Sequence, residues 1–263
     1  MKIRRKLPKP SRAERPLYLI GYSFAPPTCS DLQSWFDLEY GGPIRLRSEP
    51  GKSTGPDHDS SVVWASHGPW SASFRVSLSS AEAGEWRDRL GWDHSHAGQV
   101  VATSSSPGSA CDQILHAARL ARGLTLLTDG TAYDVTMQAY LNPSDWKDLS
   151  LEQFRFSDHL RIEQAEAEQV GRDWFFTLGL AKFGLDELET FSPIGLPSQS
   201  VIERLTEIAQ ELLRLGHLPK VGATVTIPSL GLAVQVIRHR NTARAGIPLI
   251  LREITWHSLA ERD

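Results

Sequence analysis

Two segments of the chain contain residue types that bind metal ions. Asp57, His58 and Asp59 lie in a polar loop, and His67 follows a few residues later. Carboxylate oxygens and imidazole nitrogens both coordinate divalent cations, so His58 is a weak candidate for a metal ligand. Loops rich in Gly, Pro and Ser hold Asp and His for turn formation alone. We therefore favour a solvated loop over a metal site.

A second histidine pair follows in the sequence Asp93-His94-Ser95-His96. If this segment is a strand, His94 and His96 project from one face, as the ligands of a zinc site do. No Cys or Glu at a familiar spacing supplies a third ligand. His94 and His96 remain weak metal candidates, and we expect a polar turn between a helix and a strand instead.

Cys111 and His116 could act as a nucleophile and its base. Five residues along a helix separate them by about 140° around the axis, so the two side chains do not share a face. The sequence also lacks the hydrolase Ser elbow, the H-E-x-x-H zinc motif, paired C-x-x-C and the dinucleotide glycine fingerprint. We assign no catalytic residue and expect no cofactor.

The densest run of strand-like residues extends from Leu160 to Phe191 and ends in an acidic turn. Its candidate binding residues form an acidic rim beside a glycine kink, which would suit a cation or an amine: Phe183, Gly184, Asp186, Glu187 and Glu189. The simpler interpretation, which we favour, is a turn with solvated carboxylates, because charged residues are mostly exposed.

The segment TLGLAKFGLDELE, Thr177 to Glu189, resembles the pattern T-x-G-x-x-x-F-G-x-x-E/D-L-E of bacterial domains of unknown function. The matching positions are Thr177, Gly179, Phe183, Gly184, Glu187, Leu188 and Glu189. The resemblance implies a bacterial, soluble domain and assigns no catalytic residue.

Composition excludes several classes of protein. The 263 residues are 40% hydrophobic and 22% charged, with a net charge of -3, which is ordinary for a globular protein. A charge near neutral argues against a dedicated nucleic-acid binder. The chain has two cysteines, Cys29 and Cys111, which is too few for a disulfide scaffold. We expect them to be free thiols in a reducing compartment. No stretch is long and apolar enough to span a membrane, and no secretory signal is evident. We expect a cytoplasmic protein that does not enter membranes.

The order of expected elements predicts an α+β fold with mixed or antiparallel sheets and packed helices. Residues 1–16 are basic and contain prolines, so we expect a flexible arm. We favour a solubilising tail over docking to a nucleic acid or an acidic partner, and we expect no nucleic-acid contact elsewhere in the chain. Residues 17–147 are predicted as an N-terminal α/β lobe and 148–263 as a C-terminal α+β lobe. A single continuous domain is the alternative.

Three helices are predicted from capping residues and apolar spacing. Ser79-x-x-Glu82 has capping-box spacing before a helix over 81–90. Gly123 is expected to stop a helix over 108–122 and to precede a strand over 124–128. The third, 199–215, has an apolar stripe at helical spacing, a capping box at Ser200-x-x-Glu203 and a stop at Gly216.

Two functions are compatible with these patterns. The absence of reaction signatures and the eight tryptophans favour a non-catalytic protein-binding or accessory module, because tryptophan is enriched at interface hot spots. The alternative is a small hydrolase or metal-dependent enzyme whose groups converge from separate loops. RNA contact through the basic arm is a weaker third hypothesis.

Overall fold

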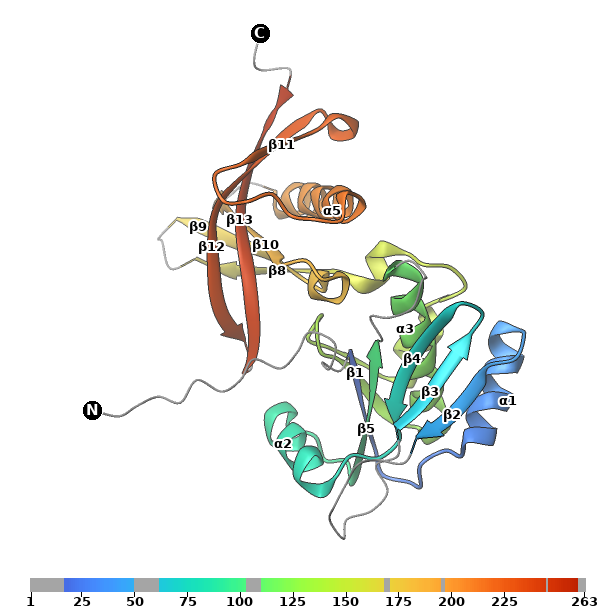
Figure 1. The fold of residues 1–263 in the computed structure, drawn as a ribbon. Helices are drawn as coiled ribbons and strands as arrows, with labels where there is room; N and C mark the ends of the chain where they lie inside the picture. Colours follow the sequence, from blue (N-terminus) through green and yellow to red (C-terminus); the bar gives the residue numbers. More distant parts are fainter. Residues whose placement is uncertain are drawn as a thin grey trace. The chain divides into compact units, whose positions relative to one another are not determined.

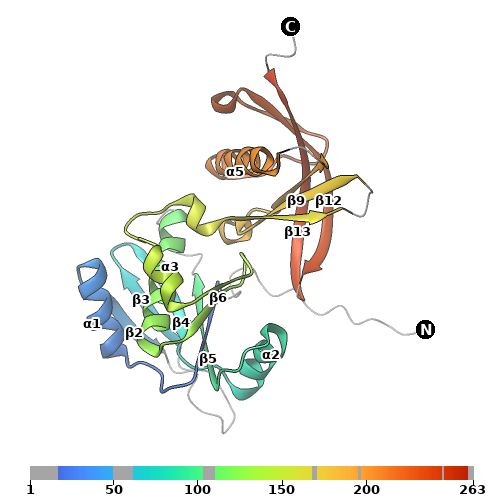
Figure 2. The same ribbon diagram turned by 180° about the vertical axis from the view of Figure 1, so that it is seen from behind.

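The computed structural model describes residues 17–49, 62–102, 110–167, 171–194, 197–244 and 246–259. Two compact units are distinguished, and the chain passes from the first to the second between Phe154 and Arg155 (Figure 1, Figure 2). The short segment Thr136–Gln138 groups with the second unit. The sequence placed this boundary between residues 147 and 148. Each unit has a mostly antiparallel sheet with packed helices, which confirms the predicted α+β class.

Unit 1 is organised around one seven-stranded sheet of order β2-β3-β4-β5-β1-β6-β7. Every neighbouring pair is antiparallel. Strand β1, with sequence YLIGY, is buried along its whole length because it is flanked by strands on both sides. The strands are β1 Tyr18–Tyr22, β2 Arg45–Glu49, β3 Val62–His67, β4 Trp70–Arg75, β5 His96–Ala102, β6 Thr131–Asp134 and β7 Ala139–Leu141.

The helices of unit 1 are α1 Cys29–Tyr40, α2 Ser80–Leu90, α3 Ala110–Thr128 and α4 Pro143–Asp148. Helix α3 is the most buried, and it packs against β1, β4 and β5 and against α1. Helix α2 begins where the sequence predicts. The Ser79 hydroxyl accepts from the Glu82 amide at 3.4 Å, and the Glu82 carboxylate accepts from the Ser79 amide at 3.1 Å.

The predicted stop at Gly123 and the predicted strand over 124–128 are wrong. Helix α3 continues to Thr128. A Cβ atom at Gly123 would lie only 2.7 Å from the Trp35 ring of α1, so this glycine allows the close approach of two helices. Beyond it, the Thr125 and Thr128 hydroxyls donate to the Ala121 and Leu124 carbonyls at 2.7 Å, as is common for threonine in a helix.

Unit 2 contains a six-stranded sheet of order β11-β12-β13-β10-β9-β8. The β10–β13 pair is parallel and the other pairs are antiparallel. The strands are β8 Arg161–Glu166, β9 Arg172–Leu178, β10 Glu187–Pro193, β11 Thr224–Ile227, β12 Leu232–Arg244 and β13 Ile247–Ser258. Short 3-10 helices are η2 Phe156–His159, η3 Leu180–Phe183 and η4 Pro228–Leu230.

Helix α5, Ser198–Leu215, packs against β9 and β10. Its buried residues, Leu205, Ile208, Ala209 and Leu212, recur at the predicted helical spacing, and Gly216 ends it in the left-handed conformation. The capping box predicted at Ser200 is wrong because α5 already begins at Ser198. The N-cap is Pro197, which provides no side-chain cap, and the first turn has no acidic residue.

The sheet of unit 2 curls strongly. Arg244 of β12 and Glu163 of β8 form an ion pair at 3.1 Å, although three strands separate β12 from β8 in the sheet order. On the concave face, a small apolar cluster forms from Phe176, Leu178, Leu249 and Leu251. None of the helices among the described residues is both long and apolar enough to cross a membrane.

Candidate binding site

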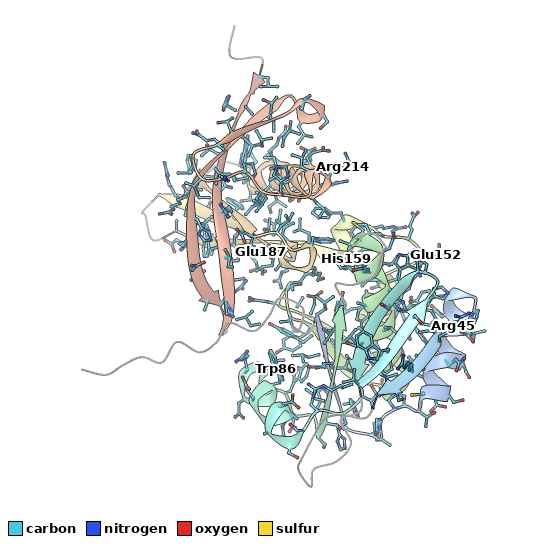
Figure 3. All side chains as sticks on the ribbon, viewed as in Figure 1. Arg45, Trp86, Glu152, His159, Glu187 and Arg214 are labelled. Atoms are coloured by element: carbon cyan, nitrogen blue, oxygen red, sulfur yellow. The ribbon has the colours of Figure 1, made fainter. Side chains whose placement is uncertain are left out.

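Glu187, a predicted binding residue whose position Figure 3 marks, is buried and surrounded by hydrogen-bond donors. Its carboxylate accepts from the Thr177 hydroxyl at 2.8 Å and from the amides of Gly179, Leu180 and Ala181 at 3.0, 3.1 and 3.0 Å. Burial raises the pKa of Glu187 to about 7, and the four hydrogen bonds oppose that rise. The carboxylate thus holds the turn between β9 and η3 in place.

Glu189, the next predicted acidic residue, is 0% exposed. It accepts from the Trp174 indole at 2.9 Å and from the Nε of Arg240 at 3.2 Å, and the Arg240 Nη2 also contacts it. The guanidinium of Arg240 lies 4.9 Å from the Trp174 ring centroid. The expectation of solvated carboxylates therefore fails at Glu187 and Glu189, because protein donors replace water around both.

The other three predicted binding residues have structural contacts. Asp186 accepts from the Nε of Arg252 at 2.8 Å. Phe183 lies against Phe156 with ring centroids 6.1 Å apart. Gly184 ends η3 in the left-handed conformation. Together with Glu187 and Glu189, these residues build the β9–β10 connection.

The histidine candidates lie in different surroundings. His94 is half-buried and packs edge-on against Trp92 at 5.6 Å, whereas His96 is exposed and stacks on Tyr22 at 5.5 Å. His96 opens β5, but His94 lies before the strand begins, so the expected alternation does not apply to it. His58, with Asp57 and Asp59, lies outside the described residues.

His116 and His67 meet in the core of unit 1. Their rings stack at 6.4 Å, and each Nε2 lies 3.1 Å from a carbonyl oxygen, that of Ala65 and Gly41 respectively. Burial lowers the pKa of His116 to about 4. Cys111 on the same helix is partly exposed, and burial raises its pKa. A neutral histidine inside the core and a protonated thiol are ordinary packing residues. Across the described ranges, no group of three or more His, Cys, Asp or Glu side chains could hold a metal ion.

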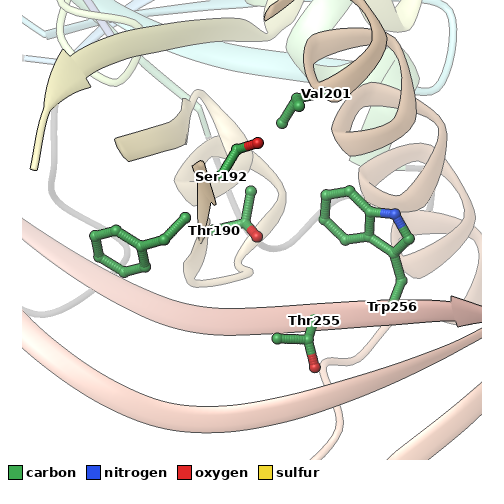
Figure 4. A pocket seen from close by; sticks show the side chains of 6 residues that line it. Thr190, Ser192, Val201, Thr255 and Trp256 are labelled. Atoms are coloured by element: carbon green, nitrogen blue, oxygen red, sulfur yellow. The ribbon is translucent and has the colours of Figure 1, made fainter. Parts of the chain in front are cut away.

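A pocket of about 170 Å³ lies where β10 and β13 separate (Figure 4). The two parallel strands pair only from Glu187 to Glu189 and from Leu251 to Glu253. Both continue beyond these residues without pairing to each other, and α5 follows β10. The residues that line the opening are Thr190, Phe191, Ser192, Val201, Thr255 and Trp256. The pocket thus lies at the carboxyl ends of neighbouring parallel strands, where open α/β sheets commonly bind ligands.

Two hydroxyl groups in this pocket have no partner within the described part of the chain. Thr190 is 4% exposed and Ser192 is 7% exposed, and both line the opening, where Figure 4 shows their side chains together with that of Trp256. Buried hydroxyls in proteins are nearly always hydrogen-bonded. The carboxylate of Glu187, a few residues earlier on the same strand, differs because four donors surround it.

Sequence reasoning missed this pocket. Thr190 and Ser192 resemble the polar positions of a strand with one wet face. Their spacing was a usable signal, since residues two apart on a strand share a face. Their position was another, because the two residues come shortly before the apolar-striped helix predicted over 199–215. What the sequence does not show is that β10 and β13 are neighbours and that they separate. No protein family, curated protein or solved structure matches the chain.

Proposed function

We propose that this chain is a non-catalytic binding module that accepts a group of a partner protein in the pocket between β10 and β13. The supporting observation is the chemistry of the lining, in which the Trp256 ring and Val201 stand beside two hydroxyls. Such a lining can bind through stacking and hydrogen bonds. It contains no carboxylate, imidazole, thiol or amine that could transfer a proton or attack a substrate.

The size of the pocket supports the same conclusion. A water molecule occupies roughly 30 Å³ in the liquid, so about 170 Å³ holds one compact chemical group. Pockets that accept a single anchoring side chain are typical of protein interfaces. The local resemblance of Thr177–Glu189 to bacterial domains of unknown function is compatible with an accessory protein.

The hydrolytic or metal-dependent alternative lacks comparable support. Glu187, Glu189 and His116 are among the acid and base groups that the described residues bury deeply, and protein atoms hydrogen-bond each of these three. These hydrogen bonds explain why the three side chains are buried: they stabilise the fold.

Filling the pocket tests the proposal. Val201→Phe enlarges a half-buried lining residue on α5, and Val221→Phe is the matched control on an exposed loop outside the pocket. Affinity capture from the source organism, with quantitative mass spectrometry, should recover a stoichiometric partner with the unchanged chain and with Val221→Phe. Val201→Phe should lose that partner while retaining its circular dichroism spectrum. Equal recovery by all three proteins, or no stoichiometric partner for any, would contradict the proposal.

A further inference from the structure

The N-terminal end of α5 has no side-chain cap within the described residues. The first amides of any helix lack partners inside the helix and carry a partial positive charge. Most helices satisfy them with a Ser, Thr, Asp or Asn at the N-cap. The N-cap of α5 is Pro197, and its first turn contains no acidic residue to offset the charge. This 18-residue helix therefore offers an anion-binding end.

Val201 connects this helix end to the pocket. Helical side chains tilt toward the N-terminus, so the side chain of Val201 covers the first turn of α5. The same side chain lines the pocket together with Ser192 and Trp256 (Figure 4). The pocket consequently lies beside the first turn of α5.

The unpartnered hydroxyls provide a second, independent indication. Thr190 and Ser192 are both more than nine-tenths buried and face the pocket. A hydroxyl is one donor, and two such donors beside a helix N-terminus match the two oxygens of a carboxylate. None of the six lining residues carries a negative charge that would repel an anion. The ring of Trp256 provides an apolar surface next to these donors.

We infer that the pocket binds a carboxylate attached to an apolar or aromatic group. The hydroxyls of Thr190 and Ser192 and the first turn of α5 hold the carboxylate, and Trp256 contacts the apolar part. This inference rests on the proposed function, since the C-terminal residue of a partner protein is one source of such a group. A free organic acid is the other source with the same chemistry.

Calorimetric titration with N-acetyl-phenylalanine and with its amide tests the charge requirement. The acid should bind at least about tenfold more tightly than the amide, a difference of about 1.4 kcal/mol. Thr190→Val and Ser192→Ala should each weaken binding of the acid by roughly fivefold, as expected for one hydrogen bond, and leave the amide unaffected. Thr224→Val, on the exposed edge of β11, should change neither affinity. Thermal melting verifies that each variant is folded.

Equal affinity for acid and amide, or no detectable binding of the acid at millimolar concentration, would overturn the inference. A hexapeptide with a free C-terminal phenylalanine distinguishes the sources. Tighter binding than N-acetyl-phenylalanine identifies a protein terminus, and no binding of the peptide identifies a small organic acid. If Val201→Phe still abolishes partner capture while acid and amide bind equally, the proposed function stands and the pocket accepts a neutral group instead.

Discussion

The two units contain different buried ionisable groups. In unit 1, burial lowers the pKa of His116 to about 4 and raises that of Tyr18, so both groups are neutral in the core at neutral pH. In unit 2, two carboxylates are buried in the sheet, and each is surrounded by donors that belong to the chain. His116 and Tyr18 avoid buried charge by being neutral, as His159 of unit 2 also does, whereas the two carboxylates of unit 2 are satisfied by hydrogen bonds.

This difference makes the pocket distinctive. A buried polar group costs free energy unless it has a partner, and the carboxylates of Glu187 and Glu189 follow that rule. Thr190 and Ser192 depart from it within the described chain, and they lie where the sheet of unit 2 opens. Because both residues line an opening, a bound ligand can provide a partner for their hydroxyls.

The largest loss of stability is expected from Gly179→Ala, which changes the turn whose amides donate to Glu187. Gly179 has a φ of +123°, and an added Cβ atom would lie 2.2 Å from the His159 carbonyl oxygen. Because the Gly179 backbone is held by Glu187 and cannot move away without breaking that contact, we expect a loss of more than about 4 kcal/mol. Hydrogen exchange should show faster exchange throughout unit 2 and unchanged exchange in unit 1.

Gly171→Ala is the matched control for that variant. Gly171 also has a positive φ, of +87°, but no atom lies within 4 Å of an added Cβ. Its cost should be about 1 kcal/mol. Similar exchange in the two variants would show that the clash with His159 is easily relieved.

A smaller effect is expected from Glu187→Gln, which tests whether the buried carboxylate is satisfied by its donors. A glutamine side chain has one acceptor oxygen, so at least one of the amides of Gly179, Leu180 and Ala181 loses its partner. We expect a destabilisation of unit 2 of about 2 to 3 kcal/mol at pH 8, measured by urea denaturation. A stability equal to that of the unchanged chain would mean that the four hydrogen bonds contribute little.

The comparison also predicts different responses to acid. The pKa of His116 is lowered to about 4 in the folded chain from 6.5 when unfolded. The unfolded chain therefore binds more protons between these values, and unit 1 loses stability as the pH falls, by about 2 kcal/mol from pH 7 to pH 5. Hydrogen exchange measured as a function of pH, after correction for intrinsic rates, gives this slope. His116→Gln should make the slope shallower by this amount, and His96→Gln, at an exposed histidine of the same unit, is the control.

In unit 2, two groups act in opposite directions over the same pH range. The pKa of Glu187 is raised to about 7 in the folded chain, from 4.5 when unfolded. Between these values the folded chain binds more protons than the unfolded chain, so stability falls as the pH rises from 4.5. Burial lowers the pKa of His159 to about 3, which removes stability as the pH falls below 6.5. The two contributions offset each other between pH 4.5 and 6.5. A slope in unit 2 as steep as that of unit 1 would refute the assigned shifts.

Local sequence patterns predicted those parts of the fold that depend on neighbouring residues. The capping box at Ser79 and Glu82 and the stop at Gly216 are satisfied within one or two turns of helix, so spacing alone identifies them. Gly123 carries the same stop signal as Gly216, but tertiary packing against Trp35 overrides it. One sequence thus contains a glycine used to end a helix and another used to bring two helices together.

The candidate site was less accessible to sequence reasoning because its residues meet through strand pairing. Asp186, Glu187 and Glu189 read as a solvated turn, yet Glu189 is buried by Trp174 and by Arg240, which lies 51 residues away along the chain. Likewise, Trp256 and Thr190 line the same pocket only because β13 pairs in parallel with β10. Neither partner is predictable without the order of the strands in the sheet.

The ion pair between Arg244 and Glu163 has a consequence for the behaviour of the protein at high concentration. By curling until β12 approaches β8, the sheet places charged side chains of its own on the edge strand β8 and on the part of β12 that extends beyond β11. Exposed, flat strand edges are the surfaces through which proteins polymerise into fibrils. Unit 2 can therefore contain strands of 13 and 12 residues without offering them as templates for fibril growth.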